Sequence, residues 1–127
     1  MAKTLSIVEC AYRGTIEEQD DTVLWFNQAM VNAGFEVDVL LRGNAVNYAV
    51  RGQDVSGLRF GAASLDNPPH IDKDVEWFQA KNRTVYVVAE DLADRGIDRA
   101  ELVEPVKVVP RAEVARIVTG YDRVYNW

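Results

Sequence analysis

The chain has 127 residues, of which 48% are hydrophobic and 27% are charged, and its formal net charge is −6. We therefore expect residues 1–127 to form a single globular domain that buries its own core. The excess of acidic residues argues against nucleic-acid binding, and no apolar run approaches the roughly 20 residues needed to cross a bilayer. The single cysteine, Cys10, cannot form an internal disulfide, which favours a cytoplasmic location.

Strand patterns alternate with helix patterns in the first half of the chain. Residues 4–10 (TLSIVEC) predict a strand, and residues 20–33 predict a helix that ends before a glycine. Residues 35–41 (FEVDVLL) predict a second strand, followed by a short helix at 45–50. Residues 53–69 show no periodicity, which predicts a long loop that acts as a lid or a partner-binding segment.

Helical spacing predicts which faces of the helices are buried. In the first helix, Val23, Phe26, Met30 and Ala33 lie on one predicted face. Asn44 precedes the short helix and is placed to cap it. A later helix at residues 71–82 carries an apolar stripe, and further elements alternate as strand and helix to the end of the chain. The stripe residues are Ile71, Val75 and Phe78. The further elements are expected at residues 84–89, 90–96, 106–109, 111–119 and 121–127.

This alternation predicts an α/β fold in which helices cover both faces of a mostly parallel sheet. With right-handed crossovers, it becomes a three-layer α/β/α domain with five strands and a flavodoxin-like topology. Ligands bind at the carboxyl ends of the strands in such folds, so we expect the functional site at that edge. The candidate site residues at that edge are Cys10, Arg13, Arg42, Asn44, Glu90 and Asp91.

Several functions common in this fold class are excluded by missing motifs. The loop after the first strand has one glycine, Gly14, and four acidic residues between positions 17 and 21, which would repel a phosphate. No glycine-rich dinucleotide motif or P-loop occurs, so we expect no cofactor. A phospho-receiver domain needs an acid pair after strand one and a lysine after strand five, and both are lacking. His70 is the only histidine, so we expect no metal site.

Three segments carry short motifs in a characteristic order. They are LLRGNAVNYAVRGQ (40–53), VYVVAEDLADRGID (85–98) and VVPRAEVARIVTGYDRVYNW (108–127). Their G-[DN]-A-V segment, V-Y-V strand and R-G-I turn resemble the DsrE/DsrF-like family, which includes the TusD-like sulfur-relay subunits. The resemblance implies a small α/β domain that assembles into trimers, hexamers or mixed complexes. It also implies a persulfide carried on a cysteine at the end of the V-Y-V strand.

That acceptor position corresponds here to Val88 or Ala89, so the acceptor cysteine does not carry over. The first hypothesis is an oligomeric DsrE-like protein of sulfur metabolism that acts as a binding or scaffold subunit. A small ligand or the persulfide-bearing segment of a sulfur-carrier partner would approach the edge formed by Cys10, Arg42, Asn44 and Glu90.

Two alternatives stay open. Cys10 could itself carry the sulfur, because it follows the first strand at the same edge. Its thiolate would need positive charge, which Arg13 and Arg42 could supply, although Glu9 opposes it. The competing interpretation is that Cys10 is a small buried hydrophobic residue. The other alternative is a small-molecule hydrolase that uses Glu90 or Asp91, although adjacent carboxylates at a helix start are more often caps that suit its dipole.

Large aromatic residues predict self-association. Trp25 and Trp77 flank the core stripes of their helices, and the last strand ends in Tyr125 and Trp127. Interfaces are enriched in such side chains, and an edge strand needs protection or a partner. We therefore expect a homo-oligomer, a trimer or hexamer, in which the 53–69 loop joins the contact through Leu58, Phe60 and Leu65.

Overall fold

The computed structural model describes residues 2–12, 22–64, 66 and 68–127, and within them five strands form one sheet. The strands are β1 (Lys3–Val8), β2 (Glu36–Leu41), β5 (Val85–Val88), β6 (Lys107–Val109) and β7 (Arg123–Asn126). Their order in the sheet is β6-β5-β2-β1-β7, and every neighbouring pair is parallel. The predicted five-stranded parallel sheet is confirmed.

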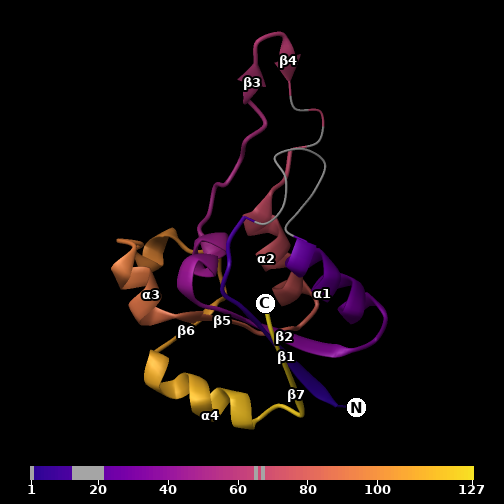
Figure 1. The fold of residues 1–127 in the computed structure, drawn as a ribbon, viewed down its shortest axis with the longest axis vertical. Helices are drawn as coiled ribbons and strands as arrows, with labels where there is room; N and C mark the ends of the chain where they lie inside the picture. The colour runs from indigo at the N-terminus through magenta and orange to yellow at the C-terminus, as the bar shows by residue number, and fades with distance from the viewer. Residues whose placement is uncertain (1, 13–21, 65, 67) are drawn as a thin grey trace.

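Helices cover the two faces of this sheet unequally. Figure 1 shows α1, α2 and α3 on one side of the sheet and α4 on the other. The chain steps from β1 to β2, β5 and β6 in one direction, so right-handed crossovers place their helices on one face. The return from β6 to β7 runs the opposite way and places α4 on the other face. The helical segments are α1 (Thr22–Asn32), η1 (Gly43–Ala49), α2 (Ile71–Ala80), α3 (Ala89–Asp94), η2 (Arg99–Glu101), η3 (Arg111–Glu113) and α4 (Val114–Thr119).

This arrangement is the predicted three-layer, flavodoxin-like α/β/α class. Numbered along the chain, the sheet strands run 4-3-2-1-5, whereas flavodoxin itself runs 2-1-3-4-5. Here the last strand, β7, lies beside β1, and the Trp127 N–H donates to the Ile7 carbonyl at 2.9 Å. The chain therefore ends at the carboxyl edge of the sheet.

Each face of the sheet has its own apolar core. On the side of α1, α2 and α3, the strand residues Val39 and Leu41 pack with Val75 and Phe78 of α2. The predicted α2 stripe is confirmed, because Ile71, Val75 and Phe78 are all buried. On the side of α4, a smaller core packs strand residues against one helix turn. Its members include Leu5, Ile7, Leu40, Val88, Val114, Ile117 and Val118.

The predicted buried face of α1 is wrong in part. Val23 is buried, but Phe26 is 42% exposed and Ala33 is exposed, whereas Asn27 is completely buried. Asn27 is accommodated because its amide makes two hydrogen bonds: Ser6 Oγ donates to its Oδ1 at 2.6 Å, and its Nδ2 donates to the Val23 carbonyl at 2.8 Å. The buried face of α1 is therefore rotated relative to the predicted one, and it includes the polar contact between Asn27 and Ser6 of β1.

The predicted loop at residues 53–69 contains a short hairpin. Arg59–Phe60 (β3) and Ala63–Ser64 (β4) pair in antiparallel fashion, and Figure 1 shows this hairpin projecting away from the sheet. Phe60 at its tip is 59% exposed. Leu65, which the sequence places in a subunit contact, lies outside the described residues.

Candidate functional site

The predicted site residues meet where the parallel strands end. Four of the six, Arg42, Asn44, Glu90 and Asp91, belong to one set of hydrogen bonds and ion pairs at the carboxyl edge. Arg13 lies outside the described residues. We call this set the carboxyl-edge network; its members are Glu9, Arg42, Gly43, Asn44, Glu90, Asp91, Arg95 and Arg111.

Asp91 joins three segments of the chain. Its Oδ2 accepts the Gly43 N–H at 2.8 Å, and its Oδ1 accepts Arg111 Nη2 at 2.7 Å. Although partial burial opposes it, the Gly43 hydrogen bond and the Arg111 guanidinium hold the pKa of Asp91 below its usual range. Gly43 has φ +58°, a conformation that favours glycine, so the chain can turn its N–H toward this carboxylate. Asp91 is therefore an ionised brace between η1, α3 and η3.

The Glu90 side chain binds the backbone of η3, the segment that also contacts Asp91. Both of its carboxylate oxygens accept the Arg111 N–H, at 2.8 and 3.1 Å, and this bond is the main cause that lowers the pKa of Glu90. With their pKa values lowered, Glu90 and Asp91 are both deprotonated at neutral pH. Neither therefore has a proton to donate as a general acid.

Arg42 and Asn44 also have partners within the network. The Arg42 guanidinium forms an ion pair with the Glu9 carboxylate. Asn44 Oδ1 accepts two hydrogen bonds from Arg95, at 3.1 Å from Nε and 2.7 Å from Nη2. The predicted capping role of Asn44 is wrong, because η1 starts at Gly43 with Arg42 in the N-cap position and Asn44 lies inside the helix.

Cys10 is exposed just after β1, so the interpretation of this residue as a small buried hydrophobe is wrong. The residue before it, Glu9, pairs with Arg42. Of the two arginines expected to favour a thiolate, Arg42 is directed to the Glu9 carboxylate, and Arg13 lies outside the described residues. An exposed thiol at this edge is accessible to a partner or a reagent.

Of the two residues at the expected acceptor position, Val88 is buried and Ala89 lines a cavity. Val88 is 1% exposed and packs in the α4-side core. Ala89 begins α3 and lines a cavity of about 470 Å³, whose walls carry no thiol, hydroxyl, imidazole or amine. The lining residues are Ala89, Glu90, Leu92, Ala93, Ile97, Arg99 and Pro110.

Arg95 and Arg111 belong to the carboxyl-edge network but were not among the candidate site residues, although the sequence pattern does place Arg111 at this edge. Both belong to segments quoted for the family resemblance, but the pairing of each with a particular acid or amide depends on the strand order. Among the described residues, no group of three or more histidine, cysteine or acidic side chains could hold a metal ion. In the same part of the chain, no helix has the length and hydropathy that a membrane crossing requires.

The parallel sheet and its helix layers define a small three-layer α/β/α domain. The YchN protein from E. coli has a similar structure, with a TM-score of 0.76 and 20% identity over 100% of both chains. MTH1491 from Methanobacterium thermoautotrophicum, a protein of unknown function, gives a TM-score of 0.65 and 15% identity over 98% of this chain and 99% of its own. No family model and no curated protein matches the sequence. The likeness to these two proteins supports the fold.

Proposed function

We propose that the protein is an oligomeric DsrE-like subunit of sulfur metabolism that binds a small ligand or a partner's persulfide-bearing segment without carrying sulfur itself. The observation that carries this proposal is the cavity beside Ala89. The family resemblance places the sulfur acceptor at Val88 or Ala89. Here the cavity at that place is lined mainly by apolar residues, with Glu90 and Arg99 as its charged residues, and no thiol lines it to accept sulfur.

The carboxyl-edge network suits binding better than acid–base chemistry. Asn44, Glu90 and Asp91 accept hydrogen bonds from other segments at this edge, and these bonds tie the segments together. Arg42 pairs with Glu9, while its buried Nε has no hydrogen-bond partner among the described residues. The hydrolase alternative needs Glu90 or Asp91 as a general acid, or as a base or nucleophile that is free of other contacts. Both carboxylates are deprotonated, and both already accept hydrogen bonds from neighbouring segments. Arg99 at the cavity wall supplies a cation that would attract the negative charge of a persulfide.

A sulfur carrier that uses Cys10 is the second candidate. The exposure of Cys10 at the same edge favours it. A persulfide forms when a thiolate attacks a donor's terminal sulfur and displaces the donor thiolate, so an accessible sulfur atom is the first requirement.

Intact mass measurement separates the two candidates. The wild-type protein is incubated with polysulfide or glutathione persulfide, and the Cys10→Ser variant is the matched control. The binding role predicts no gain of sulfur, together with shifts of the amide resonances around Ala89 and Ile97 in the presence of glutathione persulfide. A gain of one sulfur atom that disappears in Cys10→Ser would establish the carrier instead.

Self-association is the second part of the proposal. β7 is an edge strand. The centroid of the Trp127 ring lies 6.3 Å from that of Tyr125 in β7 and 5.6 Å from that of Phe26 in α1. Trp25 on the same helix is 59% exposed. Gel filtration with light scattering is expected to give three or six times the 14.3 kDa chain mass. We expect Trp25→Ser to lower that mass, whereas a wild-type monomer would contradict the proposal.

A further inference from the structure

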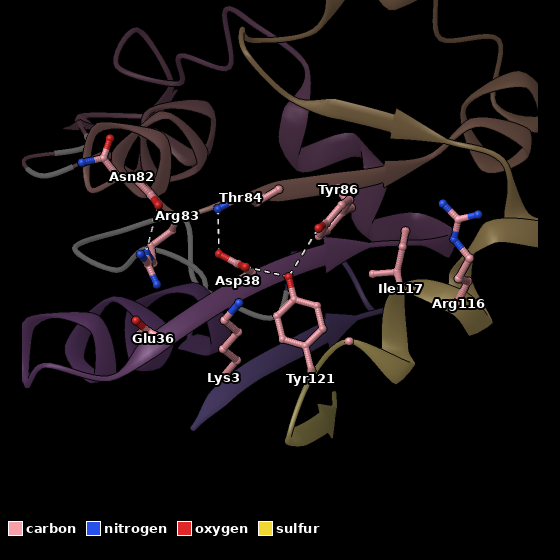
Figure 2. A pocket seen from close by; sticks show the side chains of 11 residues that line it. Lys3, Glu36, Asp38, Asn82, Arg83, Thr84, Tyr86, Arg116, Ile117 and Tyr121 are labelled. Atoms are coloured by element: carbon pink, nitrogen blue, oxygen red, sulfur yellow. Dashed lines mark hydrogen bonds between the residues drawn. The ribbon is translucent and has the colours of Figure 1, made fainter. Parts of the chain in front are cut away.

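A second cavity, of about 550 Å³, lies at the opposite end of the sheet, on the face that carries α4 (Figure 2). Lys3 and Glu36 are the first residues of β1 and β2, Thr84 precedes β5, and Tyr121 precedes β7. These positions form the amino end of the strands. The cavity is therefore separate from the carboxyl-edge network and from the proposed function there.

The cavity is lined by the end of α4, the residues that follow it and the amino ends of the strands. Glu36, Asp38 and Leu40 alternate along β2 toward this face. Leu40 lies in the apolar core under α4. The six residues of α4 span only about 9 Å, and Arg116 and Ile117 near the end of this helix line the cavity together with Glu36 and Asp38. The two carboxylates, Glu36 and Asp38, make the amino end of β2 polar on this face.

Asp38 is the centre of a fixed polar array. Its Oδ1 accepts the Thr84 N–H at 2.7 Å, and its Oδ2 accepts the Tyr121 hydroxyl at 2.6 Å. The Tyr86 hydroxyl oxygen lies 3.4 Å from that of Tyr121. Burial, followed by the hydrogen bond to Asp38, raises the pKa of Tyr121, so its hydroxyl remains a neutral donor. The array thus presents oxygen atoms in set positions, without rearrangement.

Cations surround this array. Lys3, Arg83 and Arg116 line the cavity together with the carboxylates of Glu36 and Asp38. Arg116 forms an ion pair with Glu113 at 3.4 Å, so Lys3 and Arg83 are the remaining cations. Figure 2 shows the Lys3 side chain directed toward Asp38 and Tyr121. Among the carboxylates in the described part of the chain, none lies within 4.0 Å of Lys3 Nζ or the Arg83 guanidinium.

We propose that this cavity binds a small hydroxylated anion, a carboxylate or a phosphate monoester. Its anionic oxygens would meet Lys3 and Arg83, and its hydroxyl groups would donate to Asp38 and Glu36 and meet the hydroxyl of Tyr86. The volume lies within the range of about 300–1,000 Å³ that holds small molecules in proteins. A neutral polyol would leave the two cations without a partner, and a plain anion would leave the carboxylates without donors.

Titrations followed by amide resonances test this assignment at constant ionic strength. The probes are glycerate and glycerol 3-phosphate, with glycerol as the uncharged control and acetate as the control without hydroxyl groups. Glycerate, glycerol 3-phosphate or both are expected to give saturable shifts confined to residues such as Lys3, Asp38, Thr84 and Tyr121. Whichever of these two probes binds with the higher affinity shows whether the anionic group is a carboxylate or a phosphate. Glycerol and acetate are expected to bind at least about tenfold more weakly.

Charge-neutralising variants complete the test. The Lys3→Gln/Arg83→Gln double variant is expected to lose at least about tenfold in affinity. The control, Lys73→Gln/Arg59→Gln, removes equal charge elsewhere and is expected to bind as the wild type does. Circular dichroism verifies the fold of both. Equal affinities of the two double variants, non-saturable shifts, or glycerol binding as tightly as the anions would overturn the proposal. So would a loss of oligomer mass in Lys3→Gln/Arg83→Gln, because the face would then be a subunit contact.

Discussion

Replacing Asp91 with alanine is expected to lower the free energy of unfolding by about 2 kcal/mol, chiefly because the Gly43 N–H loses its charged acceptor. Asp91 is only 13% exposed, so water cannot readily replace the carboxylate. The Arg111 ion pair adds less, because the Arg111 side chain is 57% exposed and its charge is screened by solvent. Urea unfolding at pH 7, compared with the wild type, measures the loss.

Asp94→Ala is the matched control for this variant. Asp94 lies on the same helix, is 68% exposed and approaches Arg111 only at 3.9 Å, so its removal is expected to have little effect. If Asp91 were a catalytic group without a structural role, Asp91→Ala would unfold at the same urea concentration as Asp94→Ala. That result would restore the hydrolase alternative.

The effect of Asp91 also has a predicted pH dependence. The pKa of Asp91 is lower in the folded protein than its unfolded-state value of about 3.9. The ionised carboxylate therefore stabilises the fold fully above the unfolded-state pKa, and this stabilisation is lost as the pH falls through the folded-state pKa. The difference between wild type and Asp91→Ala is expected to be constant from about pH 8 to 5 and to narrow below about pH 4.

Asn27→Ala is expected to lower the free energy of unfolding by more, about 3 kcal/mol, because it removes two buried hydrogen bonds and leaves the Ser6 hydroxyl group without its acceptor. Ser6 Oγ also accepts the indole N–H of Trp127 at 3.2 Å. The substitution thus disturbs the contact between α1, β1 and the end of the chain.

The control for Asn27→Ala is Asn32→Ala, the same change at an exposed position of α1. Thermal and urea unfolding of the two variants are expected to differ clearly, with Asn32→Ala close to the wild type. Equal stability of the two variants would show that Asn27 is not anchored by Ser6. Trp127 fluorescence gives a second measurement, because its indole is expected to move when Ser6 loses its acceptor.

The two cavities have different consequences for function. The one beside Ala89 lies at the edge where α/β folds commonly bind ligands, and no thiol lines it. The one around Asp38 lies at the amino end of the same strands and is polar and charged. Sulfur transfer tests address only the first cavity, and anion titrations address only the second. Failure of either proposal therefore leaves the other standing.

Much of the fold and part of the site could be predicted from sequence. The alternation of strand and helix patterns predicts the parallel sheet, and parallel strands bring their carboxyl ends together, so Arg42, Asn44, Glu90 and Asp91 were correctly grouped at one edge. Their roles were not predictable, because Asp91 meets Gly43 and Glu90 meets the Arg111 backbone only after β5 has taken its place between β2 and β6.

Sequence by itself determined the class of this domain, since periodicity reports which residues can be apolar in a helix or a strand. It also determined that Cys10 is the only thiol and that Val88 and Ala89 cannot accept sulfur. Tertiary structure alone decided that Asn27 is buried in place of Phe26, and that Asp38, in mid-strand, faces an open cavity. The physical reason is that burial depends on what lies opposite a residue, and opposite Asp38 the end of α4 and Tyr121 leave a polar cavity.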